Sequence, residues 1–261
     1  MGININADLS KPVKKVVHTT SDLAVNLGGK PISEIGNILE ALFGIPADAA
    51  ISLRTKLQMK HKANQQILAE KLQKKVASIP ENNICEPNFQ TISTAFENAK
   101  HCDSDELREL FANLIASSIN IEKKDDVHPS FSEIIKQMSP LDARNLKLFK
   151  NEDGLPISQY RVRNEDNSYD ILMSNVFLGK IGENVNLTAQ SASITNLQRL
   201  GLLEITYSSR FSNFSRYDEA EELLQALFSN EIKPNEEREL KNGIIRKTPL
   251  GEKFVNACIE D

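Results

Sequence analysis

Apolar residues recur at helical spacing through the first 150 residues and predict a series of α-helices. The most regular stretch is 105–120, where Leu, Phe and Ile fall at i, i+3, i+4, i+7 and i+8 and alanines widen the stripe. A helix with so broad an apolar arc needs neighbours on most sides, so we expect it to be the central helix of a bundle. The other predicted helices span 32–42, 47–78, 89–99, 131–138 and 141–150.

Capping residues mark where three of these helices begin. Asp103, with Glu106 three residues later, resembles a capping box at the start of the central helix. Pro129 is expected at a first helical position, with His128 capping that helix or closing the loop before it. The tetrapeptide Ser-Pro-Leu-Asp at 139–142 predicts another start, with serine as N-cap and proline at the first helical position.

The pattern changes after residue 150, where short strand-like runs alternate with helices. A helix closed by Arg-Leu-Gly-Leu, then a strand, an interruption and a returning strand that leads into Thr-Pro-Leu-Gly is typical of a winged helix. The interruption, residues 208–242, contains an acidic helix at 217–228, so the wing carries an insertion. The other elements here are strands at 159–163 and 203–207, a helix at 187–200, and a strand and a helix within 244–254.

The predicted fold is mainly α, with an N-terminal helical bundle followed by a winged-helix-like α+β domain. A chain of 261 residues is long enough for two cores. We expect an N-terminal extension at 1–30, which ends at a Gly-Gly pair, then the bundle at 31–139 and the winged-helix-like domain at 140–261.

The composition limits the class of protein but does not indicate a particular reaction or ligand. Hydrophobic residues make up 40% and charged residues 26%, which is ordinary globular usage. The net charge of -5 argues against a surface that binds nucleic acid throughout. Three cysteines without a CxxC pair indicate neither a disulfide framework nor a zinc site, so we expect a cytoplasmic protein. No signal peptide or membrane span is predicted, and contact of residues 31–43 with a membrane surface is left open but not predicted.

The segments LRELFANLIASSIN and VHPSFSEIIKQMSPLDARNL resemble the bacterial abortive infection alpha family, Abi-alpha, which is linked to phage defence. Residues 105–148 carry the most specific part of the resemblance, and a weaker version extends over 30–205. The resemblance implies an interaction or effector protein and supplies no catalytic residue. We therefore expect an abortive-infection protein that binds a phage or host component and is not an enzyme.

The long helix at 47–78 carries the strongest local charge. Between Ala50 and Ser78 it has seven Lys and Arg against one Glu, a local charge of 7 − 1 = +6. Phosphates or acidic head groups would be attracted to it, although ion pairs with Asp105, Glu106 or Glu109 would use the same side chains. The candidate anion- or partner-binding residues are Arg54, Lys56, Lys60, Lys62, Lys71, Lys74 and Lys75.

Two further hypotheses compete with simple binding. Arg54 and His61 resemble the Arg-x(4–6)-His pattern of HEPN ribonucleases, and their spacing places both on one side of a helix. Thr55 departs from the polar Asn, Asp or His usual in that pattern, and His61 shares its helix side with Leu57 and Leu68. The structural alternative is therefore a histidine at the edge of the core.

The other hypothesis is a winged-helix regulator that binds DNA. The helix at 187–200 offers polar positions that we expect to be exposed, and a lysine lies near the wing. The helix has one basic residue and the insertion is acidic, which favours a protein-binding wing equally. The candidate nucleic-acid contacts are Gln190, Ser193, Asn196, Arg199 and Lys247.

Cofactor chemistry has little support in the sequence. No GxGxxG, Walker A or GxSxG motif is present, and the histidines and cysteines do not share metal-ligand spacing. We therefore predict no metal and no cofactor.

Asn113, at the border of the broad apolar face, is expected to hydrogen-bond between helices. The sequence leaves open whether the partner is a protein or a nucleic acid and whether the chain forms a homo-oligomer.

Overall fold

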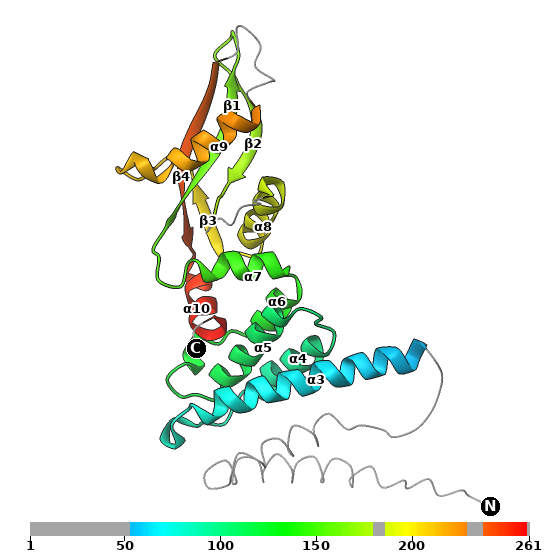
Figure 1. Cartoon of the computed structure of the whole chain (residues 1–261). Helices are drawn as coiled ribbons and strands as arrows, with labels where there is room; N and C mark the ends of the chain where they lie inside the picture. Colours follow the sequence, from blue (N-terminus) through cyan, green and yellow to red (C-terminus); the bar gives the residue numbers. More distant parts are fainter. Residues whose placement is uncertain (1–52, 180–185, 229–236, 260–261) are drawn as a thin grey trace, which may run out of the picture.

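The computed structural model describes residues 53–179, 186–228 and 237–259, with side chains from Ala63 onward. The predicted extension at 1–30 and the predicted helix at 32–42 lie outside these residues. Within the described ranges the chain forms eight α-helices and one four-stranded sheet, so the fold is mixed helical and β. Helices α3 to α7 gather at one end, the sheet extends from the other, and α10 lies where they meet (Figure 1).

The helices agree with most of the predicted segments. None of those in the described residues is long and apolar enough to cross a membrane. Their bounds are α3 Leu53–Ala77, α4 Phe89–Lys100, α5 Asp105–Ser118, α6 Phe131–Lys136, α7 Pro140–Lys147, α8 Leu187–Arg199, α9 Asp218–Phe228 and α10 Pro249–Cys258. Short 3-10 turns, η1 to η3, cover Glu81–Asn83, Lys124–Asp126 and Phe214–Arg216.

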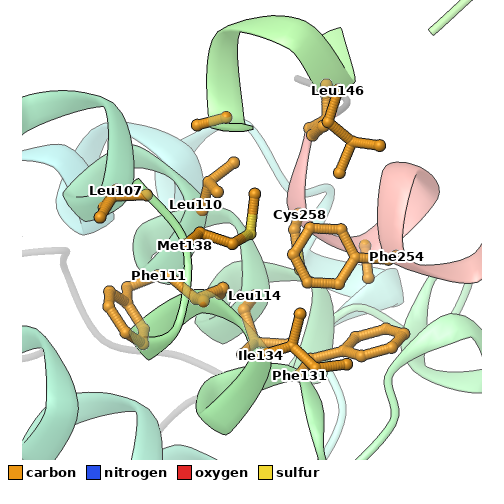
Figure 2. Close-up of a cluster of buried hydrophobic side chains, with 14 of the residues drawn as sticks. Leu107, Leu110, Phe111, Leu114, Phe131, Ile134, Met138, Leu146, Phe254 and Cys258 are labelled. Atoms are coloured by element: carbon orange, nitrogen blue, oxygen red, sulfur yellow. The ribbon is translucent and has the colours of Figure 1, made fainter. Parts of the chain in front are cut away.

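Helix α5 is enclosed by other helices, as its broad apolar arc predicts. Helices α3, α4, α6, α7 and α10 all pack against it. Leu110 and Leu114 of α5 have no exposed surface, and Phe111 is 1% exposed. Figure 2 shows these side chains meeting Phe131 of α6 and Phe254 of α10 in one buried cluster. Burial of large apolar side chains around α5 is therefore a main source of stability.

The C-terminal helix joins this core from far along the chain. Asn113 Nδ2 donates to the carbonyl oxygen of Cys258 over 2.8 Å, which confirms the predicted interhelix hydrogen bond. Ser117 Oγ donates to the carbonyl oxygen of Ala257, also over 2.8 Å. The last carbonyls of a helix have no partner within the helix, so α5 satisfies the end of α10.

Two of the three predicted helix starts differ in detail. The N-cap of α5 is Ser104, whose hydroxyl accepts from the amide of Leu107, and Asp103 precedes it. The prediction of Asp103 as the cap is wrong because Asp103 instead accepts a hydrogen bond from Asn64 of α3. Helix α6 begins only at Phe131, so the proline at 129 lies in the preceding loop rather than at a first helical position.

Local side-chain geometry at the other positions matches the sequence. His128 Nδ1 accepts from the amide of Ser130 over 3.2 Å and so closes the loop before α6, one of the two roles expected for it. At α7, Ser139 and Asp142 form the full capping box, with Pro140 at the start. These bonds satisfy amides that the first turn of a helix leaves without partners.

The sheet has the strand order β2-β1-β4-β3, and every neighbouring pair is antiparallel. Strands β1 and β4 are longer than predicted, and β2 was not predicted at all. It lies at the sheet edge, where most of its residues are exposed and two register irregularities interrupt its pairing with β1, so no clear alternation marks it. The strands are β1 Leu155–Arg163, β2 Tyr169–Val176, β3 Leu203–Thr206 and β4 Glu237–Lys247.

Helix α9, from the predicted insertion, lies across one face of the sheet (Figure 1). Its buried residues, Ala220 and Leu224, form a second small core with Tyr160 of β1 and Val176 of β2. Helix α9 is therefore packed on the sheet by apolar contacts.

Tyr207 crosses the sheet and requires a glycine beneath it. Its hydroxyl donates to Asn175 Oδ1 over 3.0 Å and receives a bond from the Asn175 amide. A side chain at Gly243 would begin 2.7 Å from the Tyr207 ring, closer than van der Waals contact allows. Burial raises the pKa of the Tyr207 hydroxyl, so it stays protonated as a donor.

Candidate functional site

The basic helix α3 uses part of its charge inside the molecule. Lys71 Nζ lies 2.7 Å from a Glu109 carboxylate oxygen and 3.2 Å from one of Asp105. Lys75 Nζ lies 2.6 Å from the other oxygen of Glu109. Two of the seven predicted anion-binding residues therefore pair with acidic side chains of α5, and Lys74 is exposed.

These ion pairs change the acid–base behaviour of their members. The hydrogen bond to Glu109 raises the pKa of Lys71 against the opposing effect of burial. Burial of Glu109 raises its pKa, but hydrogen bonds from Lys71 and Lys75 outweigh it, so the pKa of Glu109 is lowered. Both groups are thus held in their charged forms, and they join α3 to α5.

A buried polar cluster fixes α3 at a second point. Arg108 of α5 is 7% exposed, and its guanidinium donates to Asn64 Oδ1 over 3.1 Å and to the Cys102 carbonyl over 2.9 Å. Asn64 in turn donates to the Lys100 carbonyl over 3.3 Å. A buried guanidinium avoids a large desolvation cost only where its N–H groups have partners. Nη1 makes both hydrogen bonds, Nη2 lies 3.6 Å from an Asp105 carboxylate oxygen, and Nε has no partner within the described residues.

The remaining candidate residues of α3 lie nearer its start. Arg54 and His61 both belong to the helix, as do three lysines, but their side chains fall outside the described part of the chain. The ribonuclease hypothesis and the wider anion-binding hypothesis therefore stay predictions for these positions. The three lysines are Lys56, Lys60 and Lys62.

The polar side of α8 faces the helical end of the molecule. Asn145 of α7 donates to Gln190 Oε1 over 2.7 Å and to Ser193 Oγ over 2.9 Å. Asn196 donates to a carboxylate oxygen of Asp142 over 2.9 Å. The expectation that Ser193 is exposed is wrong, because the contact with α7 leaves only 4% of its surface accessible.

Two other nucleic-acid candidates also have partners within the chain. Arg199 donates to Asn196 Oδ1 over 2.8 Å and to Gln137 Oε1 over 3.2 Å. Lys247 Nζ lies 3.2 Å from a Glu252 carboxylate oxygen, and its side chain is 8% exposed. The structure thus brings Gln190, Asn196 and Arg199 together at the α7–α8 contact and places Lys247 apart from them, at the end of β4.

Another candidate surface lies in a segment that the predictions had not singled out. Between β3 and α9 the chain reads SSRFSNFSRY, in which arginines alternate with aromatic residues. The Arg210 guanidinium lies 4.6 Å from the Phe214 ring centre, and the Arg216 guanidinium lies 3.9 Å from that of Phe211. The alternation of basic and aromatic residues is the feature of the sequence from which this surface could have been predicted.

Acidic and sulfur side chains show no arrangement for metal binding in the described ranges. No group of three or more His, Cys, Asp or Glu side chains there comes close enough to hold an ion. Burial raises the pKa of the thiols of Cys102 and Cys258. Both therefore stay protonated at neutral pH, which makes them poor nucleophiles.

Comparison with known proteins gives one assignment. No curated protein and no solved structure matches the chain at a significant level. The model of one family, described as abortive infection alpha, matches residues 60–258. That match runs from α3 to the end of α10 and so includes the enclosed helix α5, the sheet and helix α9. The chain therefore belongs to the abortive infection alpha family.

Proposed function

We propose that this protein acts in abortive infection by binding a phage or host component, without catalysing a reaction on it. One observation supports this most directly: large apolar side chains remain exposed on the half of the molecule that holds the sheet. Between 37% and 57% of the surface of each residue is exposed for Tyr169, Ile171, Leu172, Phe214 and Leu227. Three of these residues lie within four positions of β2, and exposed apolar side chains that lie close together are typical of interaction surfaces.

The proposal includes the division of the chain into a helical bundle up to residue 139 and a winged-helix-like domain from residue 140. Its support is the path of the chain: α8 turns through Gly201, which has a φ of 74°, into β3. Strand β3 pairs with the returning strand β4, which leads into α10. The segment at 208–242 would then be an insertion in the wing.

A DNA-binding role for α8 has less support. Contact of Gln190, Asn196 or Arg199 with bases would compete with their present hydrogen bonds to Asn145, Asp142 and Gln137. Breaking such bonds costs about 0.5–1.5 kcal/mol each. Binding through the exposed residues of the sheet half needs no such rearrangement.

A phage-challenge experiment tests binding against catalysis. Cells that express the full chain are infected with a panel of phages, and plaque counts are compared with those on cells carrying an empty vector. The Arg54→Ala/His61→Ala variant should protect as well as the unchanged chain, whereas Ile171→Asn/Leu172→Asn should lose at least part of the protection. Purified variants must have unchanged melting temperatures. Loss of protection in the first variant alone would contradict the proposal and favour the ribonuclease.

A further inference from the structure

The segment from Ser208 to Arg216 is an exposed loop with a fixed shape. It joins β3 to α9, and its turn η3 lies at the end of α9 that projects beyond the sheet (Figure 1). All of its residues except Phe211 are exposed, and Phe211 is partly buried. The loop contains two arginines and no acidic residue.

A buried tyrosine fixes the base of this loop. Tyr217 is 2% exposed, and its hydroxyl donates to the Gly243 carbonyl of β4 over 2.9 Å. The same hydroxyl accepts from the amide of Phe211 over 3.0 Å. Near the tip, Asn213 Oδ1 accepts from the amide of Ser215 over 3.2 Å. Because the loop is already ordered, a ligand that bound it would lose little affinity to ordering it.

Phe214 is the most accessible aromatic side chain of the loop, with 50% of its surface exposed. The Arg210 guanidinium lies over one face of this ring, which places a positive charge against an aromatic side chain that is half exposed. Nucleotide bases stack on such rings whatever their sequence, and arginines beside them contact phosphate or add cation–π stacking. This pairing of an aromatic platform with a cation favours nucleic acid over a purely apolar partner.

A hollow of about 390 Å³ lies beside the loop, and Arg210 forms part of its wall. Its lining also includes Ser208, Ser209, Lys241 and Asn242, all of which donate hydrogen bonds suited to phosphate or sugar oxygens. Glu239 lines it as well, but that carboxylate pairs with Arg161. In the described part of the chain, Arg210 and Lys241 form no ion pair, so their charges are available to a ligand.

We propose that the loop Ser208–Arg216, together with Lys241, binds single-stranded nucleic acid, with a base stacked on Phe214 and phosphates held by Arg210 and Lys241. This inference names the class of ligand for the proposed binding function, and it rests on that function. Stacking on Phe214 needs an unpaired base, so duplexes are disfavoured. The acidic start of α9, at Asp218 and Glu219, lies next to the loop and keeps the number of phosphate contacts small.

The number of phosphate contacts determines how strongly salt weakens the binding. Two neutralised phosphates on a single strand predict that log K falls with log[salt] at a slope of about -1.4. Removing both cations, in Arg210→Ala/Lys241→Ala, should bring the slope close to zero. A protein ligand held by apolar contacts would show no such change.

Fluorescence anisotropy with the purified full chain tests this. The probes are a labelled 15-nucleotide oligouridine, the matching oligothymidine and a 15-base-pair duplex, at low salt. We expect both single strands to bind. Phe214→Ala should lower the affinity for each strand by about 5- to 150-fold, the range for loss of one base–aromatic stack. Phe89→Ala is the matched control, because Phe89 is also an exposed phenylalanine but lies at the start of α4, and it should change binding by less than about twofold.

The oligouridine and oligothymidine arms distinguish RNA from DNA as the ligand. Three results would overturn the inference: no binding of either strand, tighter binding of the duplex, or equal weakening by Phe214→Ala and Phe89→Ala. If Phe214→Ala abolishes phage protection although no strand binds, the ligand is a protein and only this inference fails. If strands bind as expected but the chain protects against no phage, the proposed function fails and this site stands.

Discussion

A methyl group at Gly251 would occupy space that belongs to the backbone of Leu202. A β-carbon built there would lie 2.8 Å from the Leu202 carbonyl carbon and 3.2 Å from its α-carbon, with the carbonyl oxygen closer still. All three atoms are backbone, so no side chain can rotate away. The two segments are also tied together, because the amide of Thr248 donates to the Leu202 carbonyl over 3.0 Å.

Gly251→Ala sets two effects of opposite sign against each other. Alanine favours a helix over glycine by about 1 kcal/mol, which on an exposed helix would stabilise the protein. Overpacking costs about 1–3 kcal/mol, and loss of the Thr248 hydrogen bond would add about 1 kcal/mol. The helix gain and the lost hydrogen bond cancel, so the net loss equals the overpacking cost, for which we take the middle of the range, about 2 kcal/mol.

The measurement is thermal and urea unfolding of purified protein. A loss of about 2 kcal/mol predicts a melting temperature lower by about 4–8 °C for a chain of this size. Ser93→Ala, at an exposed position in α4, is the control and should change stability by less than about 0.5 kcal/mol. A melting temperature for Gly251→Ala equal to or above that of the unchanged protein would refute the close approach of α10 to β3.

Three further changes test contacts of α5 and α3. Asn113→Ala leaves the Cys258 carbonyl without its donor, and urea unfolding should show a loss of about 1–3 kcal/mol. Glu106 has its pKa lowered to about 2, by the hydroxyl of the N-cap serine first and then by an arginine of α7. Its stabilising effect is therefore present above its ordinary value of 4.5 and lost as the pH falls toward 2, so Glu106→Gln should reduce the difference in stability between pH 7 and pH 3. Lys71→Ala should lower the melting temperature more than Lys74→Ala, because of these two lysines Lys71 alone bridges to α5 in the described structure.

Regular local patterns could be predicted from the sequence because they depend on residues close together in the chain. The burial of α5 follows from its own periodicity, and the capping box of α7 follows from four consecutive residues. The order of α8, β3, β4 and α10 was also predictable, since Gly201 and Pro249 mark its turns. Strand β2 was not predicted because an exposed, irregular edge strand has no alternation of buried and exposed residues.

The roles of polar side chains were harder to predict, because they depend on what packs beside them. Ser193 has the spacing of an exposed helix position, yet Asn145 of α7 covers it. Lys71 looks like a free cation in the sequence, yet α5 places Glu109 against it. A helix periodicity fixes which side of a helix a residue occupies and does not say which other segment will lie there.

The sequence by itself thus determined most of the helices and the order of α8, β3, β4 and α10, together with the enclosed position of α5 and the family to which the chain belongs. Only the tertiary structure decided which polar groups have hydrogen-bond or ion-pair partners within the chain and which are exposed to water. The physical reason is one of range: caps and periodicity act over a few residues, whereas Asn113 and Cys258 meet across 145 positions of the chain. The same folding leaves Arg210 and Phe214 together at the surface, where a ligand would reach them.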